Sequence, residues 1–76
     1  MFNPGDMVTL IEMPSWVAKL PIESRRVFEH CVGRTYRVEE IDADGLLVLD
    51  VSEVDVIFGG FMNDIRVEPR YVRAAP

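Results

Sequence analysis

The stretch of residues 33–51, GRTYRVEEIDADGLLVLDV, constrains the fold more than any other part of the chain. Two runs rich in valine, leucine, isoleucine and tyrosine, which favour β-strands, flank a segment of aspartate, alanine and glycine. An aspartate initiates a turn through its side chain, and a glycine adopts the positive φ that closes it. We therefore expect a β-hairpin with the four-residue loop Asp42 to Gly45.

The pairing register follows from the side chains that each loop length brings together. A loop of Asp44 and Gly45 alone places Glu39 opposite Asp50, which is a like-charge pair. A loop of residues 42–45 avoids this conflict, with apolar pairs on one face and opposite charges on the other. The dipeptide Glu39-Glu40 breaks the alternation, which allows a β-bulge there. The expected pairs are Val38 with Leu49, Tyr36 with Val51, and Arg37 with Asp50.

The segment before the hairpin predicts a strand, a loop and a helix. Alternation from Met7 to Glu12 predicts a strand. Residues 15–20 lie between two prolines, which central strands exclude, so we expect a surface loop there that carries Trp16. Residues 21–32 predict an amphipathic helix that begins with proline and is followed by a glycine stop. Its apolar face consists of Val27, Phe28, Cys31 and Val32.

The residues after the hairpin predict one or two further short strands. Residues 52–58 either extend the preceding strand or form a lip beside it. Gly59-Gly60 predicts a bend. A strand is expected from Met62 to Val67 with Ile65 and Val67 inward, and a last short strand at Tyr71-Val72.

Together these segments predict a single domain, residues 1–76, of the mainly β class. We expect four to five short antiparallel strands with one inserted short helix. Because short antiparallel strands leave exposed edges, the sheet is expected to close into a small barrel.

Composition restricts the partners and the compartment. The net charge of −5 disfavours nucleic acid and anionic membranes as partners. A lone cysteine makes no internal disulfide, and the start of the chain lacks the pattern of a signal peptide, so we expect a cytoplasmic protein. No apolar run approaches the roughly 18 residues that span a bilayer.

Two short motifs resemble a known fold family. Pro69-Arg70-Tyr71-Val72 after a strand resembles the end of SH3-like barrels, where a 3₁₀ turn with proline and tyrosine precedes a short closing strand. Pro4-Gly5-Asp6-Met7-Val8 is similar to the Gly-Asp-x-Val start of bacterial SH3-like barrels. The resemblance implies a small SH3-like barrel of the stand-alone bacterial kind. The aromatic segment and tryptophan pair of signalling SH3 domains are absent, so recognition of proline-rich peptides is not implied.

No residue pattern in the chain is typical of a catalytic, metal or cofactor site. His30 and Cys31 are neighbours on the expected helix and do not face each other, and together they fall short of a zinc site. Asp42 is interpreted as a turn residue, because Leu46 stands where a calcium loop needs an oxygen ligand. We therefore expect no enzyme activity and no cofactor.

Aromatic residues near the loops are the candidate protein-binding site. Trp16, between its prolines, is expected to have few local contacts and to be partly exposed. In an SH3-like barrel, the early loop and the 3₁₀ turn flank one groove, and an exposed aromatic groove marks a protein contact. The alternative is that the rings cap the ends of the barrel. The candidate residues are Trp16, Phe58, Phe61, Pro69 and Tyr71.

Three arginines near the end of the chain form a second candidate surface. Arg66, Arg70 and Arg73 would suit an acidic partner or phosphate. The alternative, which we favour, is a solvated face in which the arginines pair with nearby acids. Those acids are Glu68, Asp64 and Asp50.

The leading functional hypothesis is a non-catalytic protein-interaction or accessory module that buries its loop aromatics against another protein or a second copy of itself. Three alternatives remain open. They are a nucleic-acid-binding small barrel, a homodimer that buries an edge strand or the aromatic face, and an accessory domain that supports a neighbouring enzyme.

The acidic net charge generates a first prediction. The chain should bind neither duplex nor single-stranded nucleic acid at physiological salt, because affinity for phosphate backbones depends on basic side chains. Fluorescence anisotropy with labelled oligonucleotides measures this. Salt-dependent binding at micromolar concentration that weakens in Arg66→Ala or Arg70→Ala would contradict it.

Overall fold

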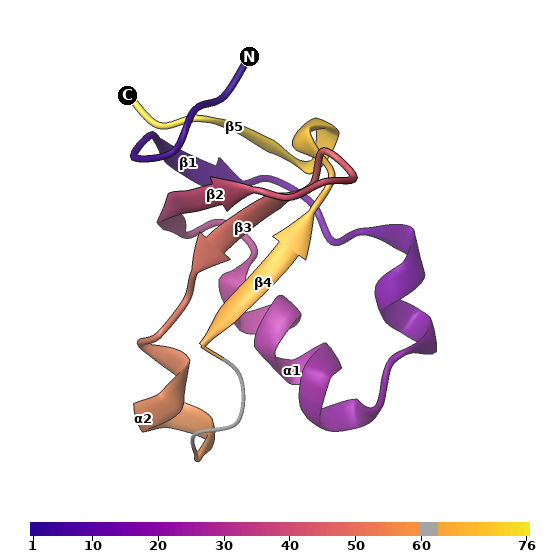
Figure 1. The fold of residues 1–76 in the computed structure, drawn as a ribbon. Coiled ribbons are helices and arrows are strands. Elements are labelled where there is room, and N and C mark those ends of the chain that lie inside the picture. The colour runs from indigo at the N-terminus through magenta and orange to yellow at the C-terminus, as the bar shows by residue number, and fades with distance from the viewer. Residues whose placement is uncertain (60–62) are drawn as a thin grey trace.

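The computed structural model describes residues 1–59 and 63–76 and shows a mainly β chain (Figure 1). All strand pairs are antiparallel, and they form one sheet in the order β4-β3-β2-β1-β5. The prediction of a mainly β fold with four to five short antiparallel strands is confirmed. The strands are β1 (Met7–Leu10), β2 (Thr35–Ile41), β3 (Leu47–Asp50), β4 (Asp64–Val67) and β5 (Val72–Ala74).

The helical elements connect the strands. The predicted amphipathic helix is confirmed as α1 (Ile22–Cys31), with Pro21 as its N-cap. The prediction of a surface loop after β1 is wrong, because residues 15–19 form the 3₁₀ helix η1 (Ser15–Lys19). Residues 52–58 form neither a strand extension nor a lip but the short helix α2 (Val54–Phe58). The 3₁₀ turn before the last strand is present as η2 (Pro69–Tyr71).

The β2–β3 hairpin has the predicted register next to the core but a different loop. Val38 pairs with Leu49 and Arg37 with Asp50, as expected. The register then shifts by one residue, so the bulge falls at Glu39. The loop is accordingly closed by Asp42, whose N–H donates to the Leu46 carbonyl at 2.9 Å. Three residues, with Gly45 at φ +83°, therefore make the turn, not the predicted four.

The outer end of the hairpin is held by the Asp42 carboxylate. Its Oδ1 accepts hydrogen bonds from the N–H groups of Leu46 at 3.0 Å and Asp44 at 2.9 Å. Its Oδ2 accepts from the Arg66 guanidinium at 3.1 Å. These bonds, the Leu46 N–H first among them, hold the pKa of Asp42 below its usual value. The interpretation of Asp42 as a turn residue is confirmed.

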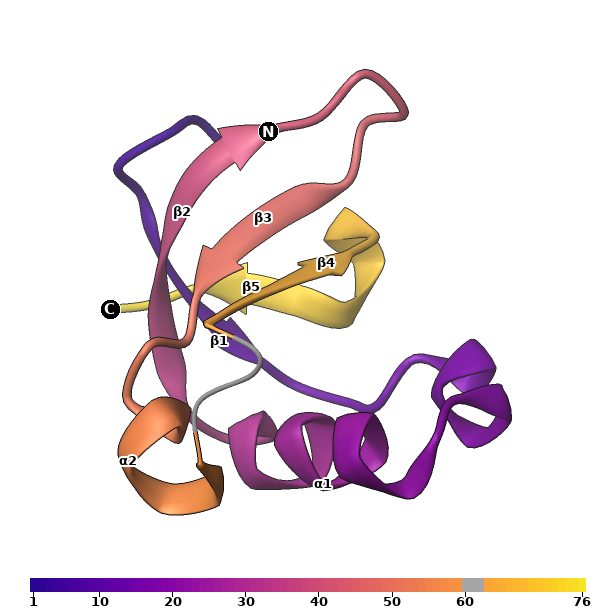
Figure 2. The same cartoon turned by 60° about the horizontal axis from the view of Figure 1, so that its bottom comes forward.

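The sheet is open, which corrects the expectation of a closed barrel. In the described residues β4 pairs only with β3, and β5 pairs only with β1. Helical elements cover the face that closure would have covered, since α1 lies along one side of the sheet (Figure 2). Val27, Phe28 and Cys31 of α1 and Val17 of η1 are buried there, so the edges need not meet to exclude water.

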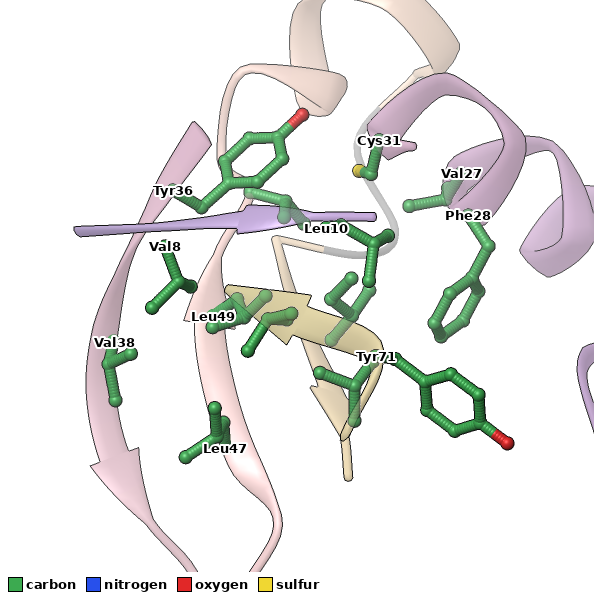
Figure 3. Close-up of a cluster of buried hydrophobic side chains, with 14 of the residues drawn as sticks. Val8, Leu10, Val27, Phe28, Cys31, Tyr36, Val38, Leu47, Leu49 and Tyr71 are labelled. Atoms are coloured by element: carbon green, nitrogen blue, oxygen red, sulfur yellow. The ribbon is translucent and has the colours of Figure 1, made fainter. Parts of the chain in front are cut away.

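One apolar cluster joins the sheet to these helices (Figure 3). Alternation along each strand decides which residues enter it, because successive side chains point to opposite faces. In β1 the buried residues are Val8 and Leu10. In β4 they are Ile65 and Val67, as predicted. Tyr36 and Val38 alternate in the same way before the bulge at Glu39. No helix in the described ranges is long and apolar enough to cross a membrane.

Leu49 lies at the centre of this cluster and is fully buried. Leu49→Ala should lower the free energy of unfolding by about 2–5 kcal/mol, because it removes methyl groups from a packed core and leaves a cavity. Urea denaturation followed by circular dichroism measures the change. Val56→Ala is the matched control, because Val56 is 91% exposed, and it should change stability by less than about 0.5 kcal/mol. Equal effects of the two substitutions would contradict the assigned core.

Candidate functional site

A shallow groove of about 260 Å³ lies between η1, α1 and the edge strand β4. Its lining is largely apolar, with an indole from η1, a phenyl ring from α1, an isoleucine from β4 and a leucine at the C-cap of η1. In Figure 1, β4 is an edge strand with α1 beside it. The residues that line the groove are Trp16, Leu20, Phe28, Asp64, Ile65 and Arg66.

Trp16 is fixed in the wall of the groove by two contacts. Its ring meets the Phe28 ring edge to face, with centroids 5.4 Å apart and planes at 83°. Its Nε1 donates a hydrogen bond to Oε1 of Glu68 at 2.9 Å. The ring is half-buried, so the expected partial exposure is confirmed. The expectation of few local contacts is wrong, because Trp16 ties η1 both to α1 and to the segment after β4.

The two prolines mark the ends of the segment that carries Trp16. Pro14 is fully buried at the N-terminal end of η1, and Pro21 caps α1. Within η1 Val17 is fully buried, so the element is anchored to the core one residue away from Trp16. The element η1 therefore packs against the core beside the sheet instead of forming a strand of it.

Two other candidate residues, Pro69 and Tyr71, lie on η2 near the same end of the sheet. Tyr71 is buried and belongs to the same apolar cluster as Phe28 (Figure 3). The Arg70 guanidinium lies 5.0 Å from the centroid of the Tyr71 ring, and it pairs with Glu68 at 3.6 Å. Glu68 therefore joins η2 to Trp16, although Tyr71 itself offers little exposed surface.

Phe58 does not join this groove. Phe58 lies on α2, where its ring meets the His30 ring at 5.7 Å between centroids. His30 also approaches Oε2 of Glu53 at 3.3 Å with its Nε2. His30 and Phe28 are two positions apart on α1 and so point to different sides of the helix. Phe61 lies outside the described residues. The structure thus brings Trp16 together with η2 and places Phe58 elsewhere.

The outer edge of β4 presents backbone groups beside the groove. The Val51 N–H donates to the Asn63 carbonyl at 3.0 Å, so Asn63 is in a hydrogen-bonded pair with β3. In an antiparallel ladder such pairs alternate, so Ile65 and Val67 also bond to β3. The N–H and C=O groups of Asp64 and Arg66 therefore point away from β3. No described residue pairs with them.

The arginines do not form one patch. Arg66 on β4 pairs with Asp42, and Arg70 pairs with Glu68. Arg73 is exposed on β5, at the opposite edge of the sheet. The expected pairing with Glu68 is confirmed for Arg70. The other two expected partners are not used, since Asp50 pairs with Arg37 at 3.8 Å and, among the described residues, Asp64 forms no ion pair. These ion pairs support the interpretation of the arginines as a solvated face.

The only cysteine and histidine do not form a reactive pair. Burial raises the pKa of the Cys31 thiol, which keeps it protonated and poorly nucleophilic. His30 contacts Glu53 instead. Within residues 1–59 and 63–76, no three side chains of the metal-binding types cluster together.

Comparison with known proteins adds no family to these observations. No protein-family model matches the chain, and no curated protein or solved structure matches it significantly. The function is therefore inferred from the chain's own geometry.

Sequence reasoning missed most of the groove. The helical spacing predicts Phe28 only as a core residue, Glu68 is expected only as a partner of the arginines, and no pattern points to Leu20. Ile65 was expected to face inward, which is right, but at a sheet edge the inward face also borders the groove. The sequence signal for an edge strand is weak here, because β4 is only four residues long.

Trp16→Ala should lower the free energy of unfolding by about 1–3 kcal/mol, because it removes the contact with Phe28 and leaves Glu68 without its indole donor. Trp16→Phe keeps an aromatic ring and loses only the N–H, so it should cost less. Urea denaturation of both variants measures the difference. If neither substitution changed stability by more than about 0.5 kcal/mol, the contacts of Trp16 would not contribute to the fold.

Proposed function

We propose that this chain is a non-catalytic protein-interaction module that docks an extended segment of a partner along the outer edge of β4. The observation that carries the proposal is the coincidence of an apolar groove with an unpaired strand edge. The same two residues, Asp64 and Arg66, line the groove and direct their backbone groups outward. A partner strand can thus use both features at once.

The mode of binding is strand addition. An added strand receives main-chain hydrogen bonds from the edge, and its alternate side chains enter pockets beside that edge. The groove lies on the side of β4 to which Ile65 points, so one side chain of the partner would contact Trp16, Leu20 and Phe28. An aliphatic or aromatic side chain suits this lining, because burial of apolar surface provides the main attraction.

The fold supports the same interpretation. The strand order β4-β3-β2-β1-β5, with a 3₁₀ turn between β4 and β5, is consistent with the SH3-like arrangement that the Pro69-Arg70-Tyr71-Val72 motif resembles. In our proposal the chain is an open variant of that arrangement, in which η1 and α1 occupy the space beside β4. The groove beside β4 is formed by these additional helical elements, and we do not equate it with the site that binds proline-rich peptides in signalling SH3 domains.

Nuclear magnetic resonance tests the proposal through the single tryptophan of the chain. Peptides selected from a random display library on the purified chain should shift the indole N–H signal of Trp16 and the amide signals of β4. The signals of β5, at the other edge, should change least. Binders that shift only α2 or β5 would contradict the proposed site.

Arg66→Pro provides a variant that blocks strand addition. It removes an outward N–H and leaves the bonds of Ile65 and Val67 to β3 intact, and proline is tolerated at such edge positions. Arg66→Ala is the matched control, because it removes the same side chain but retains the N–H. We expect peptide affinity to fall at least about tenfold in the proline variant relative to the alanine variant. Equal affinities in two folded variants would overturn the proposed mode.

A further inference from the structure

Asp64 occupies an electrostatically unfavourable position on the outer face of β4. It pairs directly with Asp50 of β3, and like charges at directly opposed positions destabilise a sheet. Asp50 has Arg37 on its other side at 3.8 Å. Among the described residues, no basic side chain lies within ion-pair distance of Asp64. The outer edge of β4 therefore lacks a cation next to this carboxylate.

The sequence of β4 can supply that cation from a second copy of the chain. An acid, Asp64, precedes Ile65, and a base, Arg66, follows it. If two β4 strands pair antiparallel about a twofold axis at Ile65, Asp64 of each copy faces the partner's Arg66. Both cross-strand pairs then join opposite charges, as a self-complementary interface requires.

The backbone fits the same register. The N–H and C=O groups that point outward are those of Asp64 and Arg66. In an antiparallel ladder, two opposed residues of a hydrogen-bonded pair exchange both of their bonds. In this register there are two such pairs, in each of which Asp64 of one copy faces Arg66 of the other. Between them the two Ile65 residues face each other, and their backbone N–H and C=O groups bond to β3 of their own copy. Every outward group of these residues gains a partner in this register.

The pairing also completes a row of charges across the sheet. Arg37, Asp50 and Asp64 are consecutive neighbours on β2, β3 and β4. The partner's Arg66 would extend this row, so that each aspartate has a guanidinium on one side. Arg66 is 55% exposed and, among the described residues, forms an ion pair with Asp42 alone, so it is available for a second carboxylate.

The groove accommodates the apolar centre of the interface. Directly opposed residues of a sheet point to the same face. The partner's Ile65 would therefore project to the side of β4 where Ile65 itself is buried, which is the side of Trp16 and Phe28.

We propose that two copies of this chain form a symmetric dimer through antiparallel pairing of their β4 strands about Ile65. This inference rests on the proposed function, of which it names the partner. Charge, hydrogen bonding and apolar contact all lead to the same register. A shift by one residue would oppose Ile65 to a charged side chain and lose both ion pairs.

Charge reversal tests the register. Sedimentation equilibrium of the chain over a dilution series should show a monomer–dimer equilibrium. Asp64→Arg creates two arginine–arginine pairs, and Arg66→Asp creates two aspartate–aspartate pairs, so each variant alone should weaken dimerisation at least about tenfold. The double variant, Asp64→Arg with Arg66→Asp, exchanges the charges and should restore the dimer.

A mixture of the two single variants provides the sharpest outcome. One copy then carries two arginines and the other two aspartates, so both pairs across the interface again join opposite charges. The mixture should form a heterodimer, although neither variant forms a homodimer. Circular dichroism establishes that each variant is folded. Ile57→Glu on α2, where Ile57 is 50% exposed, is the control for a different interface and should leave the dimer unchanged.

Three results would overturn the inference. They are a monomer at the highest concentration, a dimer that both charge reversals leave intact, and a dimer that Ile57→Glu disrupts. In each case, the peptide titration monitored at Trp16 still decides the proposed function separately. If a monomeric chain bound peptides at β4, the proposed interaction module would stand and only the proposed dimer would be rejected.

Discussion

The open sheet imposes the main constraint on this structure, because one apolar face of five short strands must be covered by something other than the sheet itself. Helix α1 provides most of the cover through Val27, Phe28 and Cys31. The 3₁₀ helix η1 adds Val17, and the Trp16–Glu68 bond connects this cover to the chain beyond β4. Without these elements, the face that carries Leu49 and Ile65 would be exposed to water.

The predictable parts of the fold are those in which local patterning and tertiary packing favour the same structure. Alternation places Val8, Leu10, Ile65 and Val67 in the core, and three- and four-residue spacing does so for α1. Barrel closure was not predictable, because strand patterns do not reveal how far apart two edges lie. The sequence of α2 does not reveal a helix, because Val54, Val56 and Phe58 also fit the alternation of a strand. Only Val54 of these is buried.

The candidate site was harder to predict, because its residues meet only through the tertiary fold. The position of Trp16 between prolines indicates a candidate binding residue, and the motif at residues 69–72 predicts the 3₁₀ turn. Glu68, which joins the two, lies 52 positions from Trp16, and the motif that follows it does not indicate a contact with an indole. The pairing of Asp50 with Asp64 could not be predicted either, because it depends on the register between β3 and β4. A pattern search along one chain cannot detect an interaction that a neighbouring strand creates.

The salt bridge between Arg66 and Asp42 connects the tip of the β2–β3 hairpin with the edge strand. In the proposed assembly one guanidinium is shared between this carboxylate and the partner's Asp64. Asp42 retains the N–H groups of Asp44 and Leu46 whichever way the guanidinium turns, so the loop keeps its shape. The hairpin tip and the edge strand are thus competitors for one cation. Pairing at the edge would therefore weaken the hold of Arg66 on Asp42 while the hairpin loop keeps its conformation.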